Sequence, residues 1–164
     1  MRRTRSIAPA VLFSLLALAG CATITPVPPI TTADTSPHGD GAFVWYDLLT
    51  EDLPKAERFY GGLFGWTFAE TDVPGYSLIE HGGRAIGGIV DTSARRSKLN
   101  ESQWVSVLST PDVEAAVGAT RDAGGTVHVR PTDLPGRGRL AVVSDPAGAL
   151  LAVLRTTTGD PPER

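Results

Sequence analysis

Asp47 is the residue whose neighbours in the sequence point most directly to chemistry. It lies in an otherwise apolar run, AFVWYDLL, that is typical of a strand. Alternate residues of a strand face the same side, so Asp47 shares a face with Trp45 and Leu49. A carboxylate on such a face could anchor the amine or hydroxyl group of a ligand, or act as a general base with a raised pKa. It could equally be the hydrogen-bonded partner of Arg84 or Arg139, and the sequence leaves both interpretations open.

The histidines are the next candidates, because histidine is the commonest metal ligand. His38 precedes the predicted domain, His81 lies in a predicted hairpin turn and His128 lies on a short predicted strand. Their positions share no spacing typical of metal ligands. The single cysteine of the chain excludes a CxxC-type metal site and an internal disulfide. We therefore expect surface or structural roles for all three histidines.

Several other classes of function lack their signatures. The serines have no histidine nearby in a recognisable nucleophile-base motif. The glycine pairs match no phosphate-binding loop, because none of them follows a strand and opens a helix. The formal net charge is -3, and the body of the chain has no block of Lys or Arg. Nucleic acid is therefore not an expected partner.

Two short amphipathic helices are predicted, and each must bury one face against a sheet. Asp52 can cap the first helix and Pro54 suits its first turn; apolar residues then recur at helical spacing up to the glycines at 61–65. Thr110 is the predicted cap of the second helix, with Pro111 at its first position.

Each predicted helix follows one strand-like run and is followed by three more. The eight runs are 42–49, 66–70, 76–80, 84–91, 103–109, 126–129, 140–144 and 149–155. The order βαβββ therefore occurs twice, which predicts two related units joined by the polar segment 91–102. We expect an α+β fold with one domain at 41–156 and a polar tail at 157–164.

These patterns resemble the glyoxalase/bleomycin-resistance proteins of the vicinal oxygen chelate (VOC) superfamily. The matching runs are WYDLLTED at 45–52, FY at 59–60, LFGW at 63–66, DVEAA at 112–116, GGTV at 124–127, PGRGR at 135–139 and DPAG at 145–148. The resemblance covers nearly all of the predicted domain. It implies one glyoxalase-like domain built from two tandem βαβββ units, with a concave sheet that binds a small molecule.

In catalytic members of that superfamily, the resemblance further implies a divalent metal held by one residue from the first and one from the last strand of each unit. These positions fall at Trp45, Gly87, Val105 and Ala152. None of these side chains binds metals, and shifting the register by one residue recovers no site. We therefore expect no metal and no cofactor, which disfavours catalysis. The alternative is a metal-dependent lyase or dioxygenase-like enzyme whose ligands lie elsewhere.

Strand alternation brings the candidate ligand-binding residues to one face of the sheet. They are Trp45, Asp47, Leu49, Val105, Val107, Ala152 and Leu154. A curved apolar face with one carboxylate is the expected lining of a small-molecule pocket. We expect Trp45 to line an open pocket, and Trp104, of opposite parity, to pack against a helix in the core. A homodimer interface or an ordinary core would show the same pattern.

The N-terminus predicts export and lipid attachment. Three arginines precede an apolar stretch at 7–19, which is shorter than the roughly 20 residues of a spanning helix. The stretch ends in LAGC, which resembles the lipobox of bacterial lipoproteins. This resemblance implies a signal peptide at 1–20 and acylation of Cys21, with palmitate among the expected chains. The alternative is a secreted protein cleaved after Ala19 or Gly20, with a free thiol.

Residues 21–40 are rich in proline and threonine and show no helical or strand periodicity, so they predict a tether between the lipid anchor and the domain. Ala22 follows the cysteine where an aspartate would favour the inner membrane. We therefore expect the periplasmic face of the outer membrane, where the cell has one. The predicted protein is a lipid-anchored envelope protein that binds a small organic molecule without a metal. An envelope interaction module without a small ligand is a further alternative.

Overall fold

The computed structural model describes residues 25–31, 37–93 and 102–161. The predicted signal peptide and Cys21 lie outside these residues, so lipid attachment stays a prediction. In the described ranges, no helix has both the length and the apolar character to cross a membrane.

The two predicted βαβββ units are present, and the α+β prediction is confirmed. The first unit contains β1 (Phe43–Thr50), α1 (Leu53–Phe64), β2 (Thr67–Glu70), β3 (Tyr76–His81) and β4 (Arg84–Asp91). The second contains β5 (Gln103–Ser109), α2 (Val113–Asp122), β6 (Thr126–Leu134), β7 (Gly138–Ser144) and β8 (Leu150–Thr156). The strand β6 extends beyond the predicted run 126–129 because it stays paired with β7 up to Leu134.

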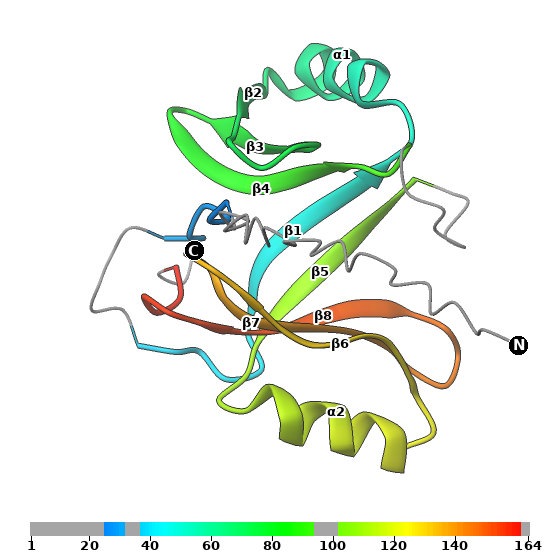
Figure 1. Cartoon of the computed structure of the whole chain (residues 1–164). Helices are drawn as coiled ribbons and strands as arrows, with labels where there is room; N and C mark the ends of the chain where they lie inside the picture. Colours follow the sequence, from blue (N-terminus) through cyan, green and yellow to red (C-terminus); the bar gives the residue numbers. More distant parts are fainter. Residues whose placement is uncertain (1–24, 32–36, 94–101, 162–164) are drawn as a thin grey trace, which may run out of the picture.

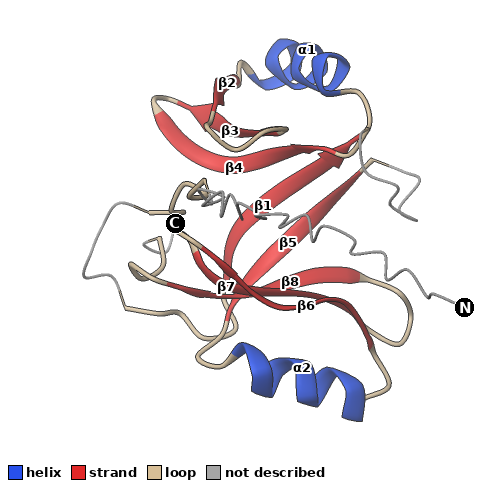
Figure 2. Cartoon of the chain, in the orientation of Figure 1, coloured by secondary structure: helices blue, strands red, loops and turns tan. Residues whose placement is uncertain are grey.

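The eight strands form one sheet in the order β2-β3-β4-β1-β5-β8-β7-β6. The units meet where β1 and β5 pair antiparallel, and each of these strands pairs in parallel with the last strand of its own unit. Figures 1 and 2 show the strongly curved sheet with α1 and α2 at opposite ends, both on its outer side. The inner side is therefore left for the candidate site.

The second helix begins two residues later than predicted. Asp112, rather than Thr110, is the N-cap: its Oδ1 accepts a hydrogen bond from Ala115 N at 2.9 Å. Thr110 Oγ1 instead donates to the Asp112 carbonyl. An aspartate directly before the first helical residue satisfies a free N–H group and favours the positive end of the helix dipole. The predicted cap of the first helix, Asp52, is confirmed.

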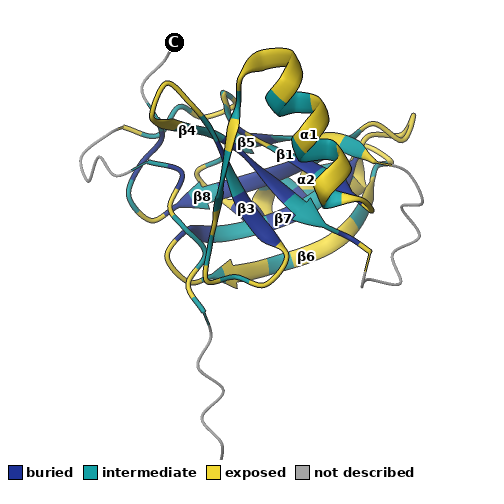
Figure 3. Cartoon of the chain, turned by 90° about the horizontal axis from the view of Figure 1, so that it is seen from above, coloured by how far each residue is buried: buried dark blue, intermediate teal, exposed yellow. Residues whose placement is uncertain are grey.

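The two helices cover the outer face unequally. On α2, Val113 and Val117 are buried against side chains of β7 and β8. On α1, no residue is fully buried, and Phe59, Leu63 and Phe64 are exposed. Figure 3 shows this exposure along α1. The outer face of the first unit is therefore the less completely packed of the two.

The inner side of the sheet holds a core of its own. The buried residues of this core are Ile30, Trp45, Val105, Val107, Ala152 and Leu154. Trp45 is only 2% exposed, so the expectation that it lines an open pocket is wrong. Trp104 faces α1 as its parity predicts, and its Nε1 donates to Tyr60 Oη, but it is 39% exposed. The burial expected of the two tryptophans is thus reversed, because Trp45 is enclosed in the inner core with Ile30 and beside Arg137, whereas α1 leaves Trp104 partly uncovered.

The described parts of the predicted tether pack against the domain instead of lying free. Val27 N donates to the Pro135 carbonyl at 2.7 Å, and Ile30 is 6% exposed. The expected polar tail also folds back: Asp160 is 3% exposed and accepts a hydrogen bond from Gly39 N at 2.7 Å. Residues 25–31 pack against the domain because burying the apolar side chain of Ile30 is favourable. Prolines also have no N–H group that burial would leave unpaired.

Truncating the two tryptophans tests this arrangement of the core. We expect Trp45→Ala to lower the free energy of unfolding by about 3–5 kcal/mol, the usual cost of truncating a buried aromatic side chain. Trp104→Ala should cost clearly less, because that side chain is already partly in water. Denaturant unfolding of both variants provides the measurement. A larger loss for Trp104→Ala would contradict the burial described above.

Candidate functional site

A connected polar cluster lies at the edge of the inner core. Asp47 Oδ1 accepts hydrogen bonds from Trp45 Nε1 at 3.0 Å and from Tyr76 Oη at 3.1 Å. Arg137 Nη2 donates to Tyr76 Oη at 2.8 Å, and Arg137 Nη1 lies 4.0 Å from Asp47 Oδ2. The cluster therefore pairs one carboxylate with one guanidinium through a shared phenol.

Three separate parts of the fold position these groups. Asp47 and Trp45 project from β1, Tyr76 begins β3, and Arg137 lies in the turn between β6 and β7. Gly88 on β4 pairs with Asp47, and a Cβ at Gly88 would collide with both Asp47 Oδ1 and Tyr76 Oη. The absence of a side chain at Gly88 is thus what allows the carboxylate and the phenol to meet.

Arg137 is buried between two aromatic rings. Its guanidinium carbon lies 5.4 Å from the centre of the Trp45 ring and 5.1 Å from that of Tyr76, and its side chain is 4% exposed. Both distances suit cation–π attraction. Its Nε donates to the Pro28 carbonyl at 2.9 Å. A buried guanidinium stacked in this way is well placed to hold an oxygen acceptor.

Burial dominates the titration of the cluster. It raises the pKa of Asp47, although the positive charge of Arg137 and the hydrogen bonds from Trp45 and Tyr76 act in the opposite direction. Burial also raises the pKa of Tyr76, and the nearby carboxylate of Asp47 raises it further. The phenol of Tyr76 therefore stays protonated at neutral pH, and its O–H group donates a hydrogen bond to Asp47 Oδ1.

The predicted ligand-binding residues do come together, but around a side chain that the prediction missed. Trp45, Val105, Val107, Ala152 and Leu154 pack with Ile30, and the partly buried Leu49 packs against the same group. Asp47 adjoins them through Trp45. The shared face is thus confirmed, whereas ligand binding at these residues stays a prediction. Ile30 was overlooked because it lies in a stretch that has the composition of a linker.

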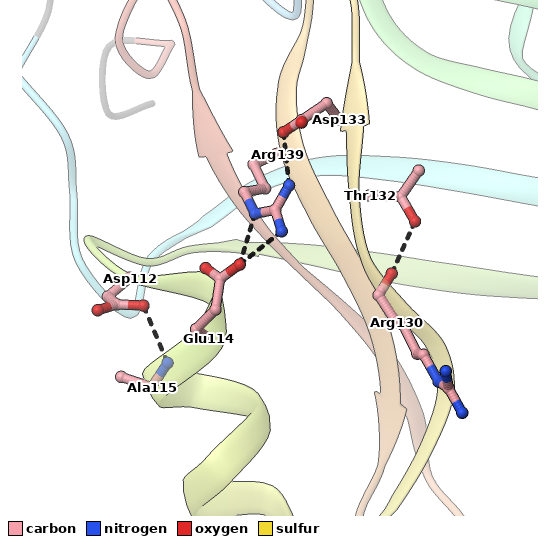
Figure 4. A network of polar contacts seen from close by, with 7 residues as sticks. All are labelled: Asp112, Glu114, Ala115, Arg130, Thr132, Asp133 and Arg139. Atoms are coloured by element: carbon pink, nitrogen blue, oxygen red, sulfur yellow. Dashed lines mark hydrogen bonds and ion pairs between the residues drawn. The ribbon is translucent and has the colours of Figure 1, made fainter.

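The partner of Asp47 differs from both residues named from the sequence. Arg139 Nε donates to Glu114 Oε1 at 2.6 Å and its Nη1 to Asp133 Oδ1 at 2.7 Å, so Arg139 links β7 to α2 and β6 (Figure 4). Arg84 is exposed at the start of β4. Arg137 pairs with Asp47 instead, because the turn before β7 carries it to the inner side of the sheet.

The donor set of the inner face does not fit a resident metal ion. At the four predicted positions, Trp45, Val105 and Ala152 are core residues, and Gly88 rather than Gly87 faces Asp47. Gly87 lines a cavity on the outer face, so its predicted place was wrong by one residue. Among the described residues, no group of three or more His, Cys, Asp or Glu side chains could hold a metal.

The histidines lie apart from one another. His38 Nδ1 is 3.7 Å from Asp160 Oδ1 and 3.2 Å from Thr156 Oγ1. His128 Nε2 is 2.9 Å from Ser144 Oγ, and His81 is exposed at the end of β3. These contacts indicate structural or surface roles.

The cavity on the outer face lies beside α1. It has a volume of about 300 Å³ and is lined by Tyr46, Trp66, Ile79, Ile86, Gly87 and Trp104. All six residues are uncharged. It lacks the convergence of charged and hydrogen-bonding groups that distinguishes the inner cluster.

Solved structures share the fold. A Streptomyces coelicolor methylmalonyl-CoA epimerase in complex with 2-nitronate-propionyl-CoA aligns with a TM-score of 0.55 and 19% identity, over 76% of this chain and all of the other. A hypothetical protein of Bacillus halodurans aligns with a TM-score of 0.53 and 12% identity, over 76% of this chain and 99% of the other. At these identities the likeness shows the fold alone.

Curated relatives are closer in sequence. The anthracycline biosynthesis protein DnrV of Streptomyces peucetius is 35% identical over an alignment of 129 residues that covers 70% of this chain and 47% of the relative. The protein CFP32 of Mycobacterium tuberculosis, provisionally named a glyoxylase, is 30% identical over 122 residues, 72% of this chain and 47% of the relative. The chain thus spans about half the length of these relatives.

The family model described as "Glyoxalase/Bleomycin resistance protein/Dioxygenase superfamily" matches residues 42–153, which contain every element from β1 to β7 and the first part of β8. This match, the two βαβββ units and the relatives agree with the resemblance seen in the sequence. The chain therefore belongs to the glyoxalase/bleomycin resistance protein/dioxygenase superfamily.

Proposed function

We propose that the domain binds a small organic molecule through an oxygen acceptor on its inner face, without a resident metal. The observation that carries this proposal is the buried guanidinium of Arg137, which lies between two aromatic rings and donates from Nε to a backbone carbonyl. Hydrogen bonds from a charged donor are stronger than those between neutral groups. A ligand carboxylate or carbonyl oxygen could take the place of that backbone carbonyl.

The rest of the inner face supplies the apolar part of the proposed site. The aliphatic side chains of β5 and β8 and the Trp45 ring form a buried wall next to Arg137. Small-molecule sites typically have an apolar lining that contains a small number of polar groups. Asp47 balances the positive charge of Arg137. Its carboxylate oxygens could also accept a hydrogen bond from a hydroxyl or amine group of the ligand.

The names of the relatives support a small-molecule function. One relative takes part in anthracycline biosynthesis and another is provisionally named a glyoxylase, while the similar epimerase structure contains a CoA ester analogue. Because this chain spans about half of the curated relatives, their activities do not transfer to it as a whole. Binding is the function that the donor set of the inner face supports best, and a metal-dependent lyase or dioxygenase-like activity finds no donor set there.

We further propose that the domain is held at the cell envelope by acylation of Cys21, on the periplasmic face of the outer membrane where the cell has one. Because residues 25–31 pack against the domain, only residues 22–24 separate the anchor from the folded part. At about 3.3–3.6 Å per extended residue, these span on the order of 10 Å. The proposed lipoprotein would therefore hold its domain close to the membrane surface.

Replacing Arg137 tests the binding proposal. In a thermal-shift screen of small carboxylates and ketones, we expect at least one compound to stabilise the wild type. A ligand at 100 times its Kd adds about 2.7 kcal/mol. Arg137→Gln should abolish this gain, whereas the matched surface variant Arg139→Gln should keep it. Stabilisation that survives Arg137→Gln would place the ligand elsewhere, and the outer cavity beside α1 would be the next site to examine.

The raised pKa of Asp47 predicts a pH dependence of stability with a definite sign. Burial makes the folded state bind a proton at Asp47 more tightly than the unfolded state does, so this residue's contribution to stability falls as pH rises. Relative to Asp47→Asn, the wild type should therefore gain stability as pH falls from the raised pKa to the ordinary value of 3.8. Denaturant unfolding of both proteins across this range gives the difference. A relative loss of wild-type stability on acidification would contradict the direction of the shift.

The lipid anchor is tested by Cys21→Ser in the full chain. Without the thiol, the variant cannot be acylated and should remain unprocessed or become soluble. Fractionation of cells, together with metabolic labelling by a palmitate analogue, measures both outcomes. A variant that stays in the membrane fraction after salt and carbonate washing, with mature size, would overturn this part of the proposal.

A further inference from the structure

We infer that residues 27–30, the sequence VPPI, are an internal occupant of the binding site, and that the external ligand shares their chemistry. That ligand would carry an oxygen acceptor for Arg137 next to a branched apolar group in the place of Ile30. This inference rests on the proposed function, because it assigns the ligand class and the regulation of the same site. In Figure 1 the segment is the blue trace that lies within the curve of the sheet.

The polar half of the inference comes from the backbone of the segment. The Pro28 carbonyl accepts the hydrogen bond from Arg137 Nε at 2.9 Å. Val27 N donates to the Pro135 carbonyl at 2.7 Å, in the turn that also carries Arg137. The segment thus presents a carbonyl oxygen to the buried guanidinium, as a ligand carboxylate or ketone would.

The apolar half comes from Ile30. Its side chain belongs to the same buried core as Trp45, Val105, Val107, Ala152 and Leu154, five of the seven residues that strand alternation assigned to ligand binding. A branched aliphatic group therefore fills the place expected for a ligand. The Pro28 carbonyl and the Ile30 side chain therefore occupy the positions that the polar end and the branched apolar end of a small ligand would take.

The turn between β6 and β7 is shaped to receive this segment. Gly136 has a φ of +85°, a conformation that other residues rarely adopt. A Cβ at this position would lie 2.6 Å from the Val27 carbonyl oxygen and 3.2 Å from the Pro26 Cβ. The turn thus accepts the close approach of the segment only because it carries a glycine.

An internal occupant lowers the apparent affinity for any external ligand, because only the fraction of molecules with the segment released can bind. If the segment is released in about 1% of molecules, the apparent Kd rises about 100-fold. The segment contributes no strand to the sheet, since it lies outside all eight strands. It can therefore leave without breaking any strand pairing, and ligand binding and release of the segment become one coupled event.

The test uses the full chain and 4-methyl-2-oxopentanoate, which combines a carboxylate and a ketone with an isobutyl group. We expect Ile30→Ala to bind this probe at least tenfold more tightly than the wild type in isothermal titration calorimetry. Pro29→Ala, at an exposed position of the same segment, is the matched control and should bind as the wild type does. Pyruvate, which lacks the isobutyl group, should bind Ile30→Ala at least tenfold more weakly than the probe.

A second variant and a second readout guard against misfolding of Ile30→Ala. Val27→Pro removes the amide that donates to Pro135 and leaves the inner core intact, so it should also tighten binding. Hydrogen exchange at Val27 in the wild type should accelerate when the probe saturates the site. The inference would be overturned if the probe bound through Arg137 with the same affinity in every segment variant and left hydrogen exchange at Val27 unchanged. That result would leave the proposed function standing. The assigned ligand class would be overturned if neither segment variant bound the probe while other carboxylates still bound through Arg137.

Discussion

The pairing of Arg137 with Asp47 is the interaction on which the inner side of this molecule depends. A guanidinium that is 4% exposed is tolerated only where charge, hydrogen bonds and polarisable surfaces replace water. Here Asp47 supplies the opposite charge, Tyr76 the shared hydrogen bond and Trp45 part of the ring surface. Asp47 in turn accepts hydrogen bonds from Trp45 and Tyr76, which position both rings.

The two units contribute different residues to the Arg137–Asp47 pair, although they have the same order of elements. In the first unit, Gly88 leaves room for Asp47 and Tyr76 to meet. In the second, the turn before β7 brings Arg137 across the seam between β1 and β5. The polar residues of the site thus come from both units, whereas β5 and β8 supply most of the apolar wall. A single unit would lack either the carboxylate or the guanidinium.

The outer face shows the opposite asymmetry. The helix α2 buries Val113 and Val117 and is further tied to the sheet by the ion pair between its Glu114 and Arg139 on β7 (Figure 4). The helix α1 buries no residue completely and leaves Phe59, Leu63 and Phe64 exposed. The inner face therefore carries the charged chemistry, while the outer face of the first unit carries exposed apolar surface.

The sequence by itself determined the architecture and the face on which the site lies. Helical and strand periodicities are local properties, and the repeated βαβββ order followed from them. Alternation along β1, β5 and β8 correctly grouped Trp45, Val107 and Leu154, because side chains two apart in a strand must share a face. Superfamily membership was also evident in the sequence, since its short runs occur in order.

Only the tertiary structure decided what fills that face and which residues complete it. Arg137 lies 90 positions from Asp47, and a loop residue has no periodicity that assigns it to a face. Ile30 belongs to a segment whose proline content predicts a linker, yet burial of one isoleucine against an apolar surface was enough to seat it. Contacts between parts of the chain far apart in sequence depend on how the elements are brought together, which no local pattern records.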